Sequence, residues 1–184
     1  MKKNKFTLLL IVFIALLIPS MTSCKKKDEL VAYKSLINEA INTTTAVTSK
    51  VEVKDQNEVV YEYVKSLIIR EDNSGYVSID EKTLDSSFSL STKSTSETLT
   101  NVNRGELFKV ELKKEYFNKY ALDNNNFTGE ISKDNMKNVF NSDYQIKDVA
   151  VLVITFENNK ITKMECTYTS TTLKTVVMST IYEY

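Results

Sequence analysis

Two cysteines are the side chains of this sequence best suited to covalent chemistry, because a thiolate is a strong nucleophile. Cys24 follows an apolar run and two small residues, Thr22 and Ser23, near the start of the chain. Cys166 lies in a segment where polar and apolar side chains alternate. A lone cysteine on an apolar strand face usually packs as a small hydrophobic residue. We therefore predict that Cys166 belongs to the core, which leaves Cys24 as the thiol to be explained.

Other patterns that carry chemistry are scarce. The sequence contains no histidine, the commonest general base and metal ligand. Its three glycines, Gly75, Gly105 and Gly129, fit neither common phosphate-binding glycine motif. Residues 123–129 look like a calcium-binding loop, but Phe127 stands at a ligand position and the glycine comes one residue late. We therefore expect no catalytic residue, no metal site and no cofactor, and predict that the protein is not an enzyme.

The start of the chain has the pattern of a secretory signal. Lys2, Lys3 and Lys5 precede a mostly aliphatic run over residues 6–18, which Pro19 ends. A basic start, an apolar stretch and small residues before a cleavage point define such signals. As a helix the run would measure roughly 20 Å, whereas the hydrocarbon core of a bilayer is ~30 Å thick. The run is therefore short for a permanent span.

The residues that follow, Met21, Thr22, Ser23 and Cys24, resemble a bacterial lipobox, in which an aliphatic and two small residues precede a cysteine. Met21 stands where leucine is usual. The resemblance covers residues 1–24 and implies cleavage by signal peptidase II between Ser23 and Cys24, after diacylglycerol is attached to the thiol. Two acyl chains anchor a protein stably where one does not. The alternatives are a plain secreted protein cut nearby and an uncleaved anchor.

This interpretation divides the chain into a signal peptide (residues 1–23), a lipidated tether (24–27) and one β-rich extracytoplasmic domain (28–184). The signal holds three of the 24 basic residues and none of the 24 acidic ones, so the remainder has a net charge of −3. The basic excess that favours nucleic acid is therefore missing. The three lysines of the tether suit anionic lipid headgroups. We expect a monomer, held by its lipid on the extracytoplasmic face of a bacterial membrane.

Hydrophobic periodicity indicates an α+β fold. Apolar residues recur at helical spacing over residues 28–42, and the alternation typical of strands begins near Ala46. Residues 59–69 predict a long strand. Residues 86–100 are rich in serine and threonine, and we predict two modest strands there with a turn near Lys93–Ser94. A disordered linker is the alternative.

The second half of the chain predicts further strands and one more helix. Alternation over residues 108–112 predicts a strand, whereas residues 113–120 fit either a strand or a helix. A short second helix is expected near 133–140. The chain then ends in a predicted antiparallel meander of three strands, over residues 149–156, 161–169 and 175–184.

The order of these elements resembles the half-barrel architecture of lipid-carrier lipoproteins, in which a curved antiparallel sheet wraps helices around an apolar cavity. The resemblance covers residues 28–184 in topology only, so no ligand residue can be transferred from it. A cystatin-like or NTF-like helix-on-sheet domain and a β-sandwich are the alternative folds. Seven side chains on the apolar face of the last meander are candidates for binding a ligand: Leu152, Ile154, Phe156, Met164, Tyr168, Met178 and Tyr182.

These features predict a membrane-anchored extracytoplasmic lipoprotein that binds an apolar or lipid-like ligand without catalysis. The alternative is a surface structural or protein-interaction module with a filled core and no small-molecule ligand. In neither case do we expect contact with nucleic acid.

Overall fold

The computed structural model describes residues 29–184 except 86, 88, 108, 109 and 124. The predicted signal peptide, its cleavage point at Ser23 and Cys24, and the lysines of the tether lie outside the described residues. The strand predicted over residues 108–112 falls partly outside them as well. None of the helices in the described part of the chain has the length and apolarity needed to cross a bilayer.

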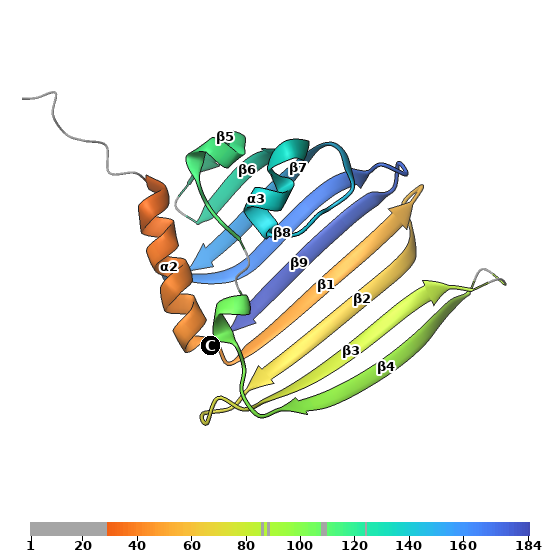
Figure 1. Cartoon of the computed structure of the whole chain (residues 1–184), viewed down its shortest axis with the longest axis horizontal. Coiled ribbons are helices and arrows are strands. Elements are labelled where there is room, and N and C mark those ends of the chain that lie inside the picture. Colours follow the sequence, from red (N-terminus) through yellow and green to blue (C-terminus); the bar gives the residue numbers. More distant parts are fainter. Residues whose placement is uncertain (1–28, 86, 88, 108–109, 124) are drawn as a thin grey trace, which may run out of the picture.

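The described residues form one curved antiparallel sheet of nine strands with helices on one side (Figure 1). The spatial order of the strands is β4-β3-β2-β1-β9-β8-β7-β6-β5. In chain order the strands are β1 (Ala46–Asp55), β2 (Glu58–Ile69), β3 (Gly75–Leu84), β4 (Leu90–Leu99), β5 (Phe117–Leu122), β6 (Asn126–Ser132), β7 (Ile146–Glu157), β8 (Lys160–Ser170) and β9 (Thr175–Glu183). The helices are α2 (Glu29–Thr43), α3 (Met136–Phe140) and the 3-10 turns η2 (Arg104–Glu106), η3 (Lys114–Tyr116) and η4 (Lys133–Asn135).

Two meanders, joined at β1 and β9, build the sheet. Strands β1 to β4 step outward to one edge, and β5 to β9 step inward from the other edge. The two meanders meet where β1 and β9 pair antiparallel, from Ala46 opposite Glu183 to Lys54 opposite Thr175. Since β4 and β5 lie at opposite edges, residues 100–116 must cross the whole sheet to connect them.

The C-terminal meander follows the predicted alternation closely. On β8 the side chains of Met164, Cys166 and Tyr168 are buried, while those between them are partly exposed. Asn158 and Asn159 form the turn before β8 with positive φ angles of 51° and 61°, a conformation that asparagine tolerates better than most residues. The predicted three-strand meander is therefore confirmed by β7, β8 and β9.

Two local predictions are wrong. The serine- and threonine-rich stretch forms the single strand β4, which runs straight through the turn expected at Lys93–Ser94. Polar side chains on both faces gave that stretch no period from which to place its ends. In addition, the described residues 110–112 of the strand predicted over 108–112 form no strand, because they belong to the segment that crosses the sheet between β4 and β5. The strand predicted over residues 59–69 is confirmed by β2, which a hairpin turn at Gln56 and Asn57, with φ angles of 48° and 73°, separates from β1.

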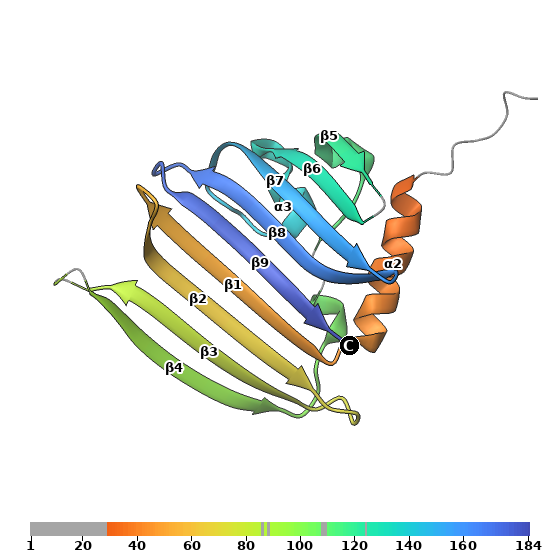
Figure 2. The same ribbon diagram turned by 180° about the vertical axis from the view of Figure 1, so that it is seen from behind.

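The helices and the crossing segment all lie on one face of the sheet, which we call the inner face; it carries Val47, Leu67, Val77, Leu152 and Cys166. The view from behind shows that neither helix nor loop covers the opposite, outer face (Figure 2). The main core lies between the inner face, α2, α3 and Leu112 of the crossing segment.

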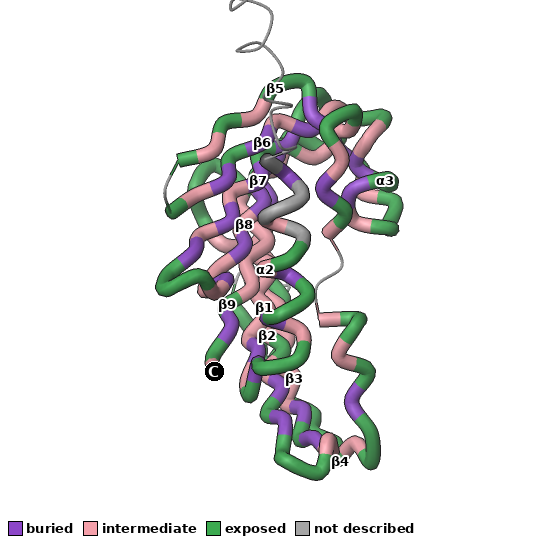
Figure 3. Tube along the Cα trace, turned by 90° about the vertical axis from the view of Figure 1, so that its left-hand side faces the viewer, coloured by how far each residue is buried: buried purple, intermediate pink, exposed green. Residues whose placement is uncertain are grey.

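A second, smaller core holds the crossing segment to the other meander, where Val102 packs with Leu67, Ile69 and Val77. Beyond it, the sheet thins to a single layer toward β4. The side view shows mostly exposed residues at that end (Figure 3), and nine of the ten residues of β4 are exposed. The fold therefore has a packed half and an open half.

Candidate functional site

A cavity of about 390 Å³ lies on the inner face of the sheet, beneath two segments that cross it. Strands β1, β7, β8 and β9 form its floor, and residues 106–107, 110 and 140–144 form its roof. The apolar side chains of the floor are Val51, Leu152, Met164, Cys166 and Met178. Those of the roof are Leu107, Val110, Phe140 and Tyr144. The cavity is therefore largely apolar and sits between secondary-structure elements that are far apart in the sequence.

The end of α3 directs the second roof segment over the floor. Asn141 caps the helix in the left-handed conformation, with φ of 50°, and so turns the chain away from the helix axis. The ring of Phe140 then packs edge-on against Tyr144 at 5.7 Å between centroids, and Tyr144 contacts Tyr168 of β8 at 6.1 Å. A chain of three aromatic rings thus joins roof to floor.

Hydrogen bonds fix the first roof segment at both ends of its crossing. The Tyr182 hydroxyl donates to the carbonyl oxygen of Leu107 at 3.1 Å. Farther along, the amide of Glu111 donates to the carbonyl oxygen of Val139 at 2.8 Å. The segment is thereby attached to β9 and to α3, so the cavity beneath it is preformed.

One side of the cavity is polar. The hydroxyls of Ser49 and Thr180 lie 3.3 Å apart across the β1–β9 pair, and Asn141, Ser142 and Glu106 stand at the roof. The exposed Glu106 carboxylate accepts from the Asn103 amide at 3.4 Å. The lining therefore offers apolar contact at one part and hydrogen bonding at another, as an amphipathic molecule would require.

The side chains that the floor directs into the cavity are uncharged at neutral pH, whereas Lys50 and Glu165, which also border it, stand at the alternate, outward positions of their strands. Burial raises the pKa of the Cys166 thiol to about 12, and the side chain is only 2% exposed. Burial, followed by the neighbouring Tyr144 and Cys166, raises the pKa of Tyr168 to about 12 as well. A protonated, buried thiol is a poor nucleophile, so Cys166 contributes a neutral, polarisable surface to the cavity.

Charged side chains on the same strands point away from the cavity, to the outer face. Lys50 of β1 pairs with Glu62 at 2.8 Å, and Glu62 pairs with Lys82 at 2.6 Å. On β8, Lys163 and Glu165 pair at 2.6 Å. Because successive residues of a strand alternate between faces, these ion pairs leave the inner face at the cavity floor to apolar and hydroxyl groups.

The seven residues predicted to bind a ligand separate into two groups. Leu152, Met164 and Met178 line the cavity. The other four are core residues outside its lining: Ile154, Phe156, Tyr168 and Tyr182. Phe156, for example, packs edge-on against Tyr33 of α2 at 4.7 Å between ring centroids.

Sequence reasoning missed part of the lining. Cys166 was assigned to the core, and its burial agrees with that, but it also reaches the cavity. Its place between Met164 and Tyr168 in the alternating β8 strand could have indicated this. The roof residues Leu107 and Val110 had no such signal, because their position depends on the course of the crossing segment.

A second hollow, larger at about 660 Å³ but more open, lies on the other side of the crossing segment, against α3. Charged and polar side chains such as Glu111, Lys137 and Asn138 line it, and Glu111 pairs with Lys113 at 2.7 Å. We regard the smaller cavity as the candidate site because it is better enclosed and a larger share of its lining residues are apolar. Within the described residues, no three carboxylate or thiol groups cluster as metal ligands would.

Comparison with known proteins assigns no family. No protein-family model matches the chain. No curated protein matches it either. Among solved structures, the chain is similar to the dehydratase domain from the CurK module of curacin polyketide synthase, at 7% sequence identity and a TM-score of 0.22. The match covers 80% of this chain and 77% of the dehydratase chain. An inactive mutant of the CurK dehydratase gives 8% identity and a TM-score of 0.23 over 83% and 77% of the two chains. Likenesses at these TM-scores carry no argument about fold or activity.

Proposed function

We propose that this chain is a membrane-anchored extracytoplasmic lipoprotein that binds one apolar or amphipathic, lipid-like ligand without catalysis. In this proposal the curved sheet acts as a half-barrel, and its inner face holds the ligand beneath the crossing segment. The protein has the lipid on Cys24 as its anchor and the bilayer as its source of ligand.

The observation that supports the proposal best is the cavity of about 390 Å³ on the inner face. Small-molecule sites usually measure about 300–1,000 Å³ and are mostly apolar with a few polar groups. Here the methionines Met164 and Met178 supply flexible apolar contact, and the Ser49–Thr180 hydroxyl pair supplies the polar end. A neutral thiol at Cys166 suits binding better than reaction, since burial keeps it protonated.

The tether adds a second line of support. If Cys24 carries the lipid, four residues separate it from Glu29, where α2 begins. Fully extended, four residues span at most about 14 Å. The domain would therefore stay within contact of the headgroups, where a lipid-like ligand is abundant.

Native mass spectrometry of residues 25–184, produced in bacteria, tests the ligand. We expect a population one small apolar molecule heavier than the polypeptide, which organic extraction removes and identifies. A clean polypeptide mass in repeated preparations, together with no uptake from added phospholipid vesicles, would contradict the proposal.

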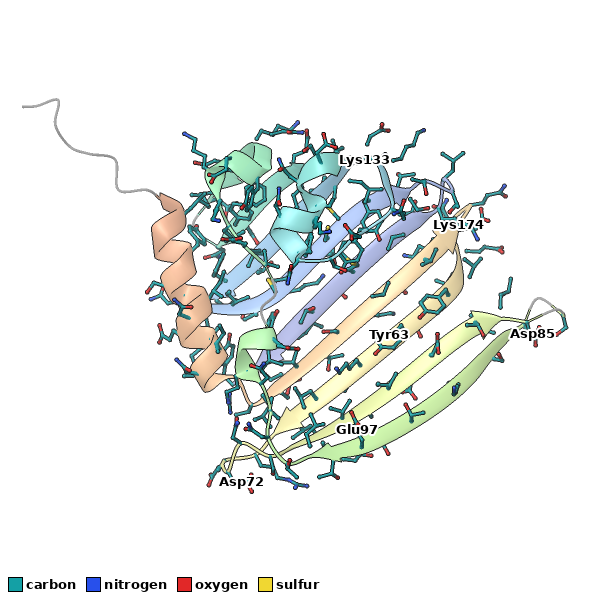
Figure 4. All side chains as sticks on the ribbon, viewed as in Figure 1. Tyr63, Asp72, Asp85, Glu97, Lys133 and Lys174 are labelled. Carbon is teal, nitrogen blue, oxygen red and sulfur yellow. The ribbon has the colours of Figure 1, made fainter. Side chains whose placement is uncertain are left out.

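The alternative function is a protein-interaction module, and one observation favours it. The crossing segment covers Leu67, Ile69 and Val77 at one end of strands β2 and β3. At the other end of β2 no described segment covers the inner face, although Tyr61 and Tyr63 lie there. Figure 4 shows Tyr63 on this uncovered surface of β2, away from the helices. A lipid-free protein that retains a partner through this surface would support the alternative.

A further inference from the structure

The outer edge of β4 is long and regular. β4 pairs with β3 at all ten of its positions, from Leu90 opposite Leu84 to Leu99 opposite Gly75, without a bulge. No described segment pairs with its other side. Proteins usually blunt such an edge with proline, a bulge, charged side chains or a covering loop, because its free backbone groups can add another strand. β4 contains no proline, and it is exposed along nearly its whole length.

The hydrogen bonds at the ends of β3 show which backbone groups of β4 point outward. The amide of Asp85 donates to the carbonyl oxygen of Ser89 at 2.9 Å, so odd-numbered residues of β4 bond to β3. The hydrogen bond from the Arg70 amide to the Ser74 carbonyl oxygen agrees with this pattern. It shows that the even-numbered residues of β3 bond to β2, which leaves the odd-numbered residues of β3 to bond to β4. The free amides and carbonyls of β4 therefore belong to its even-numbered residues: Thr92, Ser94, Ser96 and Thr98.

The charges of β4 are self-complementary. Lys93 and Glu97 are its ionisable residues, and they stand symmetrically about Thr95. When two copies of β4 pair antiparallel with Thr95 opposite Thr95, each Lys93 lies opposite Glu97 of the second copy. Opposite charges directly across a strand pair are stabilising, and like charges are destabilising.

This register also satisfies the backbone. With Thr95 opposite itself, Ser94 of one copy faces Ser96 of the other, so the free even-numbered groups meet each other. If the register is shifted so that Lys93 lies opposite Lys93, or Glu97 opposite Glu97, the free even-numbered backbone groups still meet. Like charges then lie directly opposite each other, however, which is destabilising. A shift that centres the pair on Ser94 or Ser96 also brings the free backbone groups together, but no carboxylate of the second copy then lies directly opposite Lys93. Charge and hydrogen-bond direction thus favour one register.

We propose that this chain forms a symmetric homodimer in which the β4 edges of two copies pair antiparallel about Thr95 and continue the nine-stranded sheet across the dimer axis. This proposal replaces the monomer expected from the sequence, and it does not depend on the ligand proposed above. Figure 4 shows Glu97 at the β4 edge of the sheet, the edge away from α3.

Cysteine cross-linking of the full-length protein in bacterial membranes tests the dimer. In the proposed dimer the Thr95 residues of the two copies would lie directly opposite each other, at a position of the strand pair that has no backbone hydrogen bonds. Their Cα atoms would be about 4.5 Å apart, a distance that suits a disulfide. We expect Thr95→Cys to give a covalent dimer on mild oxidation, above the level of the unsubstituted chain. Ser91→Cys is the matched control, because Ser91 is equally exposed on the same face of β4. Its two copies would be separated by about 26 Å. A Thr95→Cys chain that stays monomeric, or equal dimer yields from the two variants, would overturn the proposal.

A charge reversal tests the register. Glu97 lies opposite Val77 within its own chain, so Glu97→Lys disturbs no charged neighbour there. In the Thr95→Cys background we expect Glu97→Lys to lower the dimer yield about fivefold, since Lys93 would then face lysine in both copies. Lys93 also lies opposite Glu81 of β3 within its own chain, so the rescue combines Lys93→Glu with Glu81→Lys. This combination should restore most of the yield, because the charges are again opposite both across the dimer and within each chain. A yield unaffected by Glu97→Lys, or a combined variant no better than Glu97→Lys alone, would contradict the pairing about Thr95.

Discussion

Gly129 of β6 lies so close to the ring of Phe117 on β5 that a Cβ atom at position 129 would stand 2.5 Å from the Phe117 Cδ1 atom. The same Cβ would also meet the Phe127 ring, at 2.9 Å. Phe117 and Phe127 pack edge-on at 5.1 Å between centroids, and Phe127 is fully buried. The glycine thus makes room for two aromatic rings over the end of the sheet near α2.

Gly129→Ala should therefore destabilise the protein. We expect the free energy of unfolding to fall by about 2 kcal/mol, because overpacking a filled core forces rings from their preferred positions. Urea denaturation measures the change. Gly105→Ala is the control, since its Cβ would meet nothing closer than the Asn103 side-chain oxygen at 3.5 Å. Equal unfolding midpoints for the two variants would show that the Phe117 contact is not tight.

Arg104 makes a second structural prediction, because it joins three separate elements. Its guanidinium donates to the carbonyl oxygens of Thr44 at 2.7 Å and Ile41 at 3.3 Å, at the end of α2. It also donates to the Asn73 side-chain oxygen at 2.9 Å, in the turn between β2 and β3. Arg104→Met should lower the free energy of unfolding by about 2 kcal/mol, since hydrogen bonds to charged groups are strong.

Hydrogen exchange can separate this effect from a general loss of stability. In Arg104→Met the amide of Thr44 should exchange faster than in the parent, whereas strands β7 and β8 should change only by the global loss. Arg70→Met is the control, because Arg70 is an exposed arginine at the start of the turn that Arg104 contacts. An Arg104→Met protein as stable as Arg70→Met would contradict the bridging role.

The sequence predicts the packed end of the fold better than the open end. In the last meander, Ala150, Leu152 and Ile154 alternate with more exposed residues, and the pair Asn158–Asn159 marks the turn. One buried face and one solvated face give a period of two that can be read directly. β4 has no buried face, so no alternation marks its length.

For a similar reason, only the floor of the candidate site could be predicted from the sequence. Its floor follows from alternation on β7, β8 and β9, which is why Leu152, Met164 and Met178 were found. Its roof depends on residues 100–116, which cross from β4 to β5 because of the strand order. That order is a tertiary property set by the junction of β1 with β9, and no local pattern at Leu107 or Val110 indicates it.

The anchor makes a prediction of its own. Cys24→Ala should release the protein from membrane fractions or stall its processing, because the thiol that would carry diacylglycerol is lost. Fractionation followed by immunoblotting measures this. Cys166→Ala is the matched control, since Cys166 is a buried cysteine that should leave membrane attachment unchanged. A Cys24→Ala chain that is still matured and membrane-bound would refute the lipoprotein assignment.

Stability should fall at alkaline pH because of buried neutral acids. Burial raises the pKa of Cys166 from 9.0 to about 12, so above pH 9 the unfolded chain loses this proton while the folded chain keeps it. Folding is then opposed by about 1.4 kcal/mol per pH unit for this group until the folded pKa is reached. Tyr168, whose pKa is also raised to about 12, adds to the loss above pH 10.

Urea denaturation at pH 9 and at pH 10 measures this dependence. Cys166→Ala should flatten the decline between pH 9 and 10, where the tyrosines of the unfolded chain still hold most of their protons. If the parent and Cys166→Ala lose stability equally over that interval, the thiol titrates normally in the folded protein and its burial is not as described.

The cavity can be tested by one pair of neighbouring substitutions on β9. Met178 faces the cavity, whereas Val177 faces the outer side of the sheet opposite Glu52 of β1. Both side chains are half-buried.

We expect Met178→Lys to abolish the lipid-like mass increment and uptake from phospholipid vesicles, since a charge in the apolar lining is costly to desolvate. Val177→Lys should keep both, because the new lysine would stand beside the Glu52 carboxylate. Circular dichroism and urea midpoints establish that each variant is folded. If folded Met178→Lys protein binds lipid as well as Val177→Lys does, the ligand lies elsewhere and the cavity assignment fails.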